Sequence, residues 1–153
     1  MGKLGGTAER VYVSATSSGA HLAGVAATTD WTKYGLPGRP VRAYALCSGM
    51  YDLRGPRLSK RSAYVKFTDE AEQALSPQRH LERVNAPIVL LVGSLETPEF
   101  QRQTRDFADA LTRAGKSAEL IYCEGYNHFE IAETLGNPYG PMGRAMLSLM
   151  RLN

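Results

Sequence analysis

The residues from Val11 to Ala23 constrain the fold of this chain more than any other stretch. A short apolar run is followed by small residues and then, without a break, by an apolar, alanine-rich segment. This pattern predicts a strand, a tight turn and a helix, with Ser17 at the turn. Such a turn presents a hydroxyl at the end of a sheet and leaves the next backbone N–H groups beside it. If the chain catalyses a reaction, we expect Ser17 to be the nucleophile.

The rest of the chain alternates strand and helix patterns. Apolar runs predict four strands, at residues 11–14, 41–47, 88–92 and 119–123. Helical spacing, caps and prolines at first turns predict helices at residues 18–28, 69–75, 77–83, 98–115 and 141–150. Helices between strands favour parallel pairing with right-handed crossovers. The expected fold is therefore an α/β three-layer sandwich with a mainly parallel sheet of about four strands.

Length and composition indicate one globular domain. The chain has 153 residues, of which 43% are hydrophobic, enough for a single buried core. The net charge of +3 comes from scattered basic residues, with one cluster from Arg54 to Arg61 that we interpret as a solvated loop face. Because no basic stripe is interleaved with aromatic residues, nucleic acid is not an expected partner.

Cysteine and histidine usage gives no reason to expect a metal or another cofactor. Cys47 and Cys123 each lie in a predicted strand, so we expect buried free thiols, and the three histidines are too dispersed for a metal site. No apolar run approaches the ~18 residues of a membrane span, and the N-terminus lacks a signal-like segment. We therefore expect a cytoplasmic protein that does not enter a membrane.

Polar residues with catalytic chemistry follow three of the predicted strands. Ser17 follows the first strand, Glu96 the third and His128 the fourth. In a parallel sheet, functional groups gather at the carboxyl ends of the strands. A serine, an acid and a histidine in this chain order predict a nucleophile, an orienting carboxylate and a general base. Asp52, which follows the second strand, is a competing acid.

Each of these residues also has a purely structural interpretation. Ser17 could be only a small residue at a crowded turn, and His128 only a loop histidine. Glu96 could be a first-turn acid that complements a helix dipole. We interpret the other two histidines as structural, because His21 lies on the helix after the turn and His80 lies among the polar residues of an amphipathic helix.

Five short strings occur in a fixed order along most of the chain. They are Ser17-Ser18-Gly19-Ala20-His21-Leu22-Ala23, Ser48-Gly49 with Tyr51-Asp52-Leu53, Leu75-Ser76-Pro77, Glu96-Thr97-Pro98-Glu99-Phe100 with Arg102-Gln103, and Asn127-His128-Phe129. In this order they resemble the kynurenine formamidase (arylformamidase) group and its carboxylesterase relatives within the α/β-hydrolase fold. Any one string is weak, but five in order are fairly specific. The resemblance favours Glu96 over Asp52 as the acid.

The resemblance implies a serine hydrolase that cleaves a small aryl formamide, such as N-formylkynurenine, or a small carboxylic ester through an acyl-enzyme on Ser17. His128 would take the serine proton and later give it to the leaving group. Glu96 would fix the imidazole tautomer and stabilise the imidazolium. The backbone N–H of Ser18 would contribute to the oxyanion hole.

The chain departs from the family pattern in two places, of which the first can be accommodated by a small shift and the second implies slow turnover. The family's turn begins Gly-His-Ser, whereas this chain has Ala15-Thr16-Ser17. The family also has strands before the turn and a His-Gly-Gly loop whose N–H completes the oxyanion hole, whereas only ten residues precede the first predicted strand here. The chain thus resembles the C-terminal half of the fold, as one domain over residues 1–153 without those strands or that loop. Losing one oxyanion donor costs on the order of 10²–10³ in rate.

The second departure also predicts assembly. In the complete fold the strand before the nucleophile lies in mid-sheet, so here the strand from Val11 to Ser14 would expose unpaired backbone groups. We expect a homodimer or higher assembly in which this strand pairs with its own copy or is covered by a neighbouring helix, or else a partner chain that supplies the missing half. The alternative to an enzyme is therefore a non-catalytic hydrolase-like remnant that serves as an assembly or binding module.

Overall fold

A four-stranded sheet forms the centre of the computed structural model, which describes residues 7 and 9–152. All neighbouring strands are parallel and lie in chain order, as β1 (Tyr12–Thr16), β2 (Ala43–Cys47), β3 (Ile88–Gly93) and β4 (Ala118–Cys123). The predicted parallel α/β sheet is confirmed. The predicted strands differ only at their ends, as where β1 continues to Thr16 in register with Cys47.

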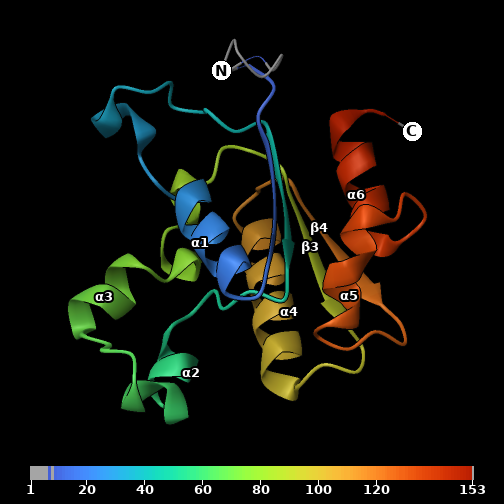
Figure 1. Ribbon diagram of the computed structural model, residues 1–153. Coiled ribbons are helices and arrows are strands. Elements are labelled where there is room, and N and C mark those ends of the chain that lie inside the picture. The colour runs from blue at the N-terminus through green and yellow to red at the C-terminus, as the bar shows by residue number, and fades with distance from the viewer. Residues whose placement is uncertain (1–6, 8, 153) are drawn as a thin grey trace.

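Helices cover both faces of the sheet and make the outer two layers (Figure 1). The helices α1 (Ser18–Ala27) and α4 (Pro98–Arg113) pack on one face, and α5 (Glu130–Glu133) and α6 (Pro141–Met150) pack on the other. Side chains alternate across a strand, so each strand contributes to both cores. Leu46 and Leu90 join the core under α1 and α4, whereas Ala45 and Leu91 join the core under α6.

The long helices begin and end where the sequence indicates. Pro98 occupies the first turn of α4, and Phe107 and Leu111 on its apolar face are fully buried. Gly115, in the left-handed region with φ of 68°, lies just beyond the end of α4. The helix α6 spans the predicted residues, and α1 ends one residue earlier than predicted.

The connection between β2 and β3 contains more structure than predicted. It holds α2 (Arg54–Arg57), the 3-10 turn η3 (Lys60–Ala63) and the predicted α3 (Asp69–Ala74). The single helix predicted over residues 77–83 is wrong, because His80 has φ of −133° and separates the 3-10 turns η4 (Pro77–Arg79) and η5 (Leu81–Arg83). The other 3-10 turns are η2 (Trp31–Tyr34) and η6 (Thr134–Gly136).

The basic cluster from Arg54 to Arg61 is not simply the solvated loop face that we predicted. It begins on α2, where the Arg57 guanidinium contacts Asp69 at 2.5 Å and Glu72 at 3.1 Å. These two ion pairs connect α2 to α3.

The strand β1 lies at the edge of the sheet. Among the described residues it pairs with β2 alone, and all five of its residues are partly exposed, whereas every residue of β2 is buried. The predicted open edge is therefore present in this part of the chain.

The cysteines are buried free thiols, as predicted. Burial raises the pKa of Cys47 to about 12 and that of Cys123 to about 11. Within residues 7 and 9–152, no helix combines the length and apolar character that crossing a membrane requires.

Candidate active site

Ser17 forms a sharp turn between β1 and α1. Its backbone has φ of 54° and ψ of −124°, a left-handed conformation that is uncommon for residues other than glycine. The Ser17 N–H donates to the Cys47 carbonyl at 2.9 Å, and its carbonyl accepts the first bond of α1 from the His21 N–H at 3.1 Å. The chain therefore changes from strand to helix at one residue, and the Ser17 side chain stands at the carboxyl end of the sheet.

Alanine at the start of this turn is accommodated without crowding. A Cβ atom placed on Gly19 would lie 3.8 Å from the Cβ of Ala15, which is ordinary van der Waals contact. The strand and the helix are therefore far enough apart here for alanine to stand where the family pattern has glycine.

His128 links Ser17 to an acid on another strand end. Its Nε2 lies 2.9 Å from Ser17 Oγ, and its Nδ1 lies 2.6 Å from Glu96 Oε2. The tautomer with the proton on Nδ1 satisfies both contacts, because Nδ1–H then donates to Glu96 and the Ser17 hydroxyl donates to Nε2. The structure thus brings together the three predicted residues, which we call the candidate triad.

Glu96 is held firmly although it is fully buried. Its side chain is 0% exposed, and Oε1 accepts hydrogen bonds from the Gly93 N–H at 3.0 Å and from the Ser48 hydroxyl. With Oε1 occupied, Oε2 is left to face His128.

The loops that carry Glu96 and His128 pack directly on each other. The Tyr126 carbonyl accepts from the Leu95 N–H at 3.1 Å, and it occupies the space that a Cβ atom on Gly93 would need. The Asn127 side chain accepts from the N–H of Phe129 at 2.9 Å, which fixes the backbone on either side of His128. A glycine at position 93 is therefore needed to bring the two loops together.

Aromatic rings surround the imidazole. Phe100 stacks on His128 with ring centroids 4.4 Å apart, and Phe129 meets it edge-on at 5.6 Å. Phe129 is largely exposed, so one side of the site is an open aromatic surface. A cleft of about 120 Å³ is lined by Phe100 together with Met50 and Pro56.

Asp52, the competing acid, and the other two histidines make contacts outside the candidate triad. Asp52 accepts from the Arg79 guanidinium at 3.1 Å and from the Arg54 N–H at 3.0 Å, and it makes no hydrogen bond with His128. His21 Nε2 lies 2.8 Å from the Leu75 carbonyl, and His80 Nε2 lies 2.8 Å from the Gln73 carbonyl. Asp52 is therefore not the partner of His128, and both histidines have structural contacts, as the sequence indicated.

Ser18 begins α1, so its N–H belongs to the first turn of the helix. No described residue accepts a hydrogen bond from this N–H. The unpaired N–H groups and the helix dipole make the N-terminus of a helix favourable for negative charge. The predicted donor is thus available beside Ser17. Among the described residues, no group of three or more histidine, cysteine, aspartate or glutamate side chains could hold a metal ion.

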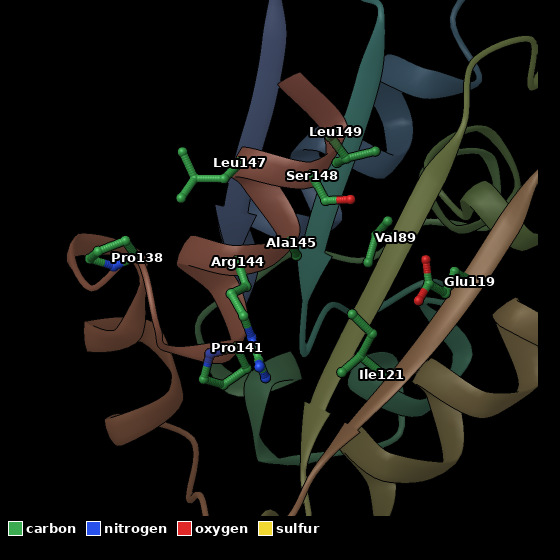
Figure 2. A pocket seen from close by; sticks show the side chains of 10 residues that line it. All are labelled: Val89, Glu119, Ile121, Pro138, Pro141, Arg144, Ala145, Leu147, Ser148 and Leu149. Carbon is green, nitrogen blue, oxygen red and sulfur yellow. The ribbon is translucent and has the colours of Figure 1, made fainter. Parts of the chain in front are cut away.

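A cavity of about 530 Å³ lies between α6 and the strands β3 and β4, outside the candidate triad. Figure 2 shows Val89 and Ile121 pointing from the sheet toward α6, with Arg144 on the helix side. No residue of the candidate triad lines this cavity, so it is not the place where Ser17 would meet a substrate.

The sequence did not predict the parts that Ser48 and Phe100 play in the site. Both residues lie within the family-like strings, but the strings indicate no role for either. The only signal for Ser48 was its place directly after β2, and nothing in the sequence indicated that its hydroxyl would meet Glu96.

Named relatives of the chain include two kynurenine formamidases. The chain is 31% identical over 130 residues to a kynurenine formamidase from Danio rerio and 32% identical over 150 residues to one from Salmo salar. The matches cover 82% and 92% of this chain but 44% and 49% of those proteins. The chain therefore spans about half the length of the curated relatives it matches. No protein-family model matches the chain.

Solved structures give the same picture of the fold. Carboxyl esterase 2 from the fungus Tuber melanosporum superposes with a TM-score of 0.70 at 22% identity, covering 99% of this chain and 55% of that one. With the named relatives, this likeness shows that the chain has an α/β-hydrolase fold and corresponds to about half of the matched proteins.

Proposed function

We propose that this chain, whose fold is that of an α/β-hydrolase and whose homologues are kynurenine formamidases and esterases, is a serine hydrolase. Its substrate would be a small aryl formamide or carboxylic ester. The observation that carries the proposal is the continuous chain of hydrogen bonds from Ser17 Oγ through His128 to the buried Glu96. The strained backbone at Ser17 and the helix N-terminus beside it support the same role.

The reaction follows from the positions of these groups. Ser17 Oγ attacks the carbonyl carbon while its proton passes to His128 Nε2, and the carbonyl electron pair moves onto the oxygen. The tetrahedral intermediate collapses and expels the amine or alcohol, which takes the proton from His128. Water then attacks the acyl-enzyme by the same path, and the carboxylic acid leaves as Ser17 regains its proton. Glu96 stabilises the imidazolium in both halves.

Turnover by this chain would be slow. The Ser18 N–H would supply one donor for the developing oxyanion, and residues 1–153 contain no His-Gly-Gly string that could supply the second. Without that donor, the rate falls on the order of 10²–10³. The acyl-enzyme would therefore form slowly and be hydrolysed slowly.

The aromatic surface supports an aryl leaving group. Phe129 is largely exposed beside His128, and its ring offers a face on which an aromatic leaving group could stack. The curated relatives are named kynurenine formamidase, and this name supports an aryl formamide as one substrate class to test.

The test is hydrolysis of p-nitrophenyl acetate and of an aryl formamide. We expect a burst of about one equivalent of nitrophenolate followed by a slower steady state, because nitrophenolate is a good leaving group and makes acylation faster than hydrolysis of the acetyl-enzyme. Ser17→Ala should abolish the burst and His128→Ala should slow it. Ser14→Ala removes a hydroxyl that has no hydrogen-bond partner in the described structure and serves as the matched control. Wild-type protein that releases nitrophenolate no faster than Ser17→Ala would refute the proposal.

The open edge of β1 favours a second function, assembly. A groove of about 480 Å³ runs beside this edge and is lined by Ser14 and by Met146, Leu147 and Met150 of α6. A second copy of the chain could pair its own β1 with this edge and cover the groove with apolar side chains. We therefore propose a homo-oligomer, and a hydrolase-like assembly module if no hydrolysis is found.

Sedimentation at micromolar concentration tests the assembly. We expect a dimer or larger species for the wild type and a monomer for Ser14→Lys, because a lysine at this edge strand opposes pairing. A wild-type protein that sediments as a monomer would contradict the edge-pairing proposal without bearing on catalysis.

A further inference from the structure

Ser48 occupies a position that mirrors Ser17 on the neighbouring strand. Thr16 is in register with Cys47, so Ser17 and Ser48 are the residues that come directly after a paired position at the carboxyl ends of β1 and β2. Both serines have φ of 54°, in the left-handed region. Ser48 differs from Ser17 in being 1% exposed, so it cannot meet a substrate.

The hydroxyl of Ser48 is directed at the acid of the candidate triad. It donates to Glu96 Oε1, the oxygen that does not face His128, and Cys47 Sγ lies 3.3 Å away. The Gly93 N–H reaches the same oxygen at 3.0 Å. Two donors on Oε1 leave Oε2 for the imidazole and fix the rotation of the carboxylate.

Because Glu96 is buried, the loss of one of its hydrogen bonds should disturb the carboxylate. The Glu96 side chain is 0% exposed, so water cannot replace a lost donor without a rearrangement of the loop. A buried carboxylate that loses one of its hydrogen bonds can rotate about its terminal torsion. Rotation weakens the contact between Oε2 and His128 Nδ1.

The backbone strain at Ser48 serves the same contact. A non-glycine residue in the left-handed region is uncommon and costs of order 1–3 kcal/mol. Its N–H still bonds to the Leu91 carbonyl at 2.9 Å, so the strand pairing is retained while the side chain turns toward Glu96. The conformation thus places the hydroxyl where an ordinary strand residue could not.

We infer that Ser48 is a positioning residue that holds the Glu96 carboxylate in the orientation that His128 requires. The inference rests on the proposed function, since it concerns the same hydrogen-bonded chain. Ser48 does not touch the reacting atoms and acts only through Glu96.

Two variants separate the hydroxyl from the backbone. Ser48→Ala removes the hydroxyl and keeps the left-handed strain, whereas Ser48→Gly removes both. If the hydroxyl matters, both variants should react with a fluorophosphonate about 10- to 100-fold more slowly than the wild type, the effect of one hydrogen bond to a charged group. The matched control, Ser14→Ala, should react at the wild-type rate. Thermal unfolding monitors folding, and Ser48→Gly should be at least as stable as Ser48→Ala.

A spectroscopic measurement needs no turnover. The His128 Nδ1–H proton, held in the 2.6 Å contact with Glu96, should give a far-downfield proton resonance in the wild type and in Ser14→Ala. We expect this resonance to shift upfield or to broaden by exchange in both Ser48 variants. Folded Ser48 variants that keep the resonance unchanged and react at the wild-type rate would overturn the inference, whatever the wild type hydrolyses. A wild type without hydrolytic activity, whose resonance nevertheless responds to Ser48, would refute the proposed function and leave Ser48 as the residue that positions Glu96.

Discussion

Ser17 and Ser48 end adjacent strands with the same left-handed backbone, yet only one of them can meet a substrate. Ser17 leads at once into α1, so its side chain is partly open and lies beside the first N–H groups of a helix. Ser48 leads into Gly49 and a buried segment, and Glu96 covers its hydroxyl. The local backbone presents a hydroxyl in both cases. The next residues along the chain decide whether that hydroxyl can attack a substrate or only support another residue.

The segment after Ser48 explains why that turn is closed. Tyr51 is fully buried and stacks on Phe107 with ring centroids 4.4 Å apart. The N–H groups of Tyr51 and Asp52 donate to the Gln103 side chain of α4 at 2.7 and 2.9 Å. The Tyr51-Asp52-Leu53 string of the sequence therefore closes the turn after Ser48 by packing, and the Ser17 string is the one that leads to an open turn.

The largest expected effect is on the acid of the candidate triad. Glu96→Gln keeps the size of the side chain but removes the charge that stabilises the imidazolium, and it permits the wrong imidazole tautomer. We expect the rate of acylation by p-nitrophenyl acetate to fall by about 10⁴-fold. Asp52→Asn is the matched control, because Asp52 pairs with Arg79 instead of His128. Equal losses in the two variants would contradict the assignment of Glu96.

The next largest effect is expected from separating the loops that carry Glu96 and His128 at the ends of β3 and β4. Gly93→Ala would push a Cβ atom into the Tyr126 carbonyl, and the backbone must move to relieve the clash. We expect unfolding to become easier by about 1–3 kcal/mol and acylation to slow, because the Glu96 and His128 loops separate. Gly136→Ala is the control, since a Cβ atom there meets no described atom within 4 Å. Denaturant titration gives the stability, and unchanged values for Gly93→Ala would show that the two loops can separate freely.

Alanine substitutions at the glycines near the two serines should change the stability of the fold in opposite directions. On the closed turn, a Cβ atom at Gly49 would lie 2.6 Å from Tyr51 Cζ, so Gly49→Ala should destabilise the fold by about 1–2 kcal/mol. On the open turn, Gly19→Ala meets only Ala15 at 3.8 Å and should stabilise α1 by about 0.5 kcal/mol. Thermal or denaturant unfolding of the pair measures the difference. If both alanines have the same sign, the distinction between an open and a closed turn fails.

The smallest expected effect is the pH dependence of the contribution that Cys47, the residue before Ser48, makes to the free energy of unfolding. Burial raises the pKa of Cys47 to about 12, above its value of about 8.5 in an unfolded chain. The folded state therefore holds the thiol proton more tightly, so this contribution is fully present below about pH 8.5 and is lost as the pH rises toward about 12. We expect the Cys47 contribution to fall by about 1 kcal/mol between about pH 8 and about pH 9.5. In Cys47→Ala the unfolding free energy should decline less steeply with pH. An equal slope in the wild type and in Cys47→Ala would contradict the burial of Cys47 beside the closed turn.

Most of the fold could be predicted because its signals are local. The continuous apolar run of β3 and the proline at the start of α4 act within a few residues, and they were enough to predict the parallel sheet and the long helices. The helix predicted over residues 77–83 failed at His80, whose φ of −133° interrupts the helix. The His80 ring contacts the Gln73 carbonyl outside that segment, and no pattern within residues 77–83 reveals this contact.

The candidate site divides in the same way. Ser17, Glu96 and His128 were predicted because each comes just after a strand, and the topology of a parallel sheet then brings such residues together. The choice of Glu96 over Asp52 needed a family resemblance, since both come after strands. The part played by Ser48 could not be predicted, because it depends on a buried contact between residues 48 positions apart.

The most direct measurement of the central claim is the site and stoichiometry of fluorophosphonate labelling. The nucleophile's oxygen would form a bond to phosphorus as fluoride leaves, and the proton would pass to His128. Peptide mapping by mass spectrometry should find one adduct per chain, on Ser17, with none on Ser48 and none on any residue of Ser17→Ala. Absence of labelling, or an adduct elsewhere that persists in Ser17→Ala, would contradict the account.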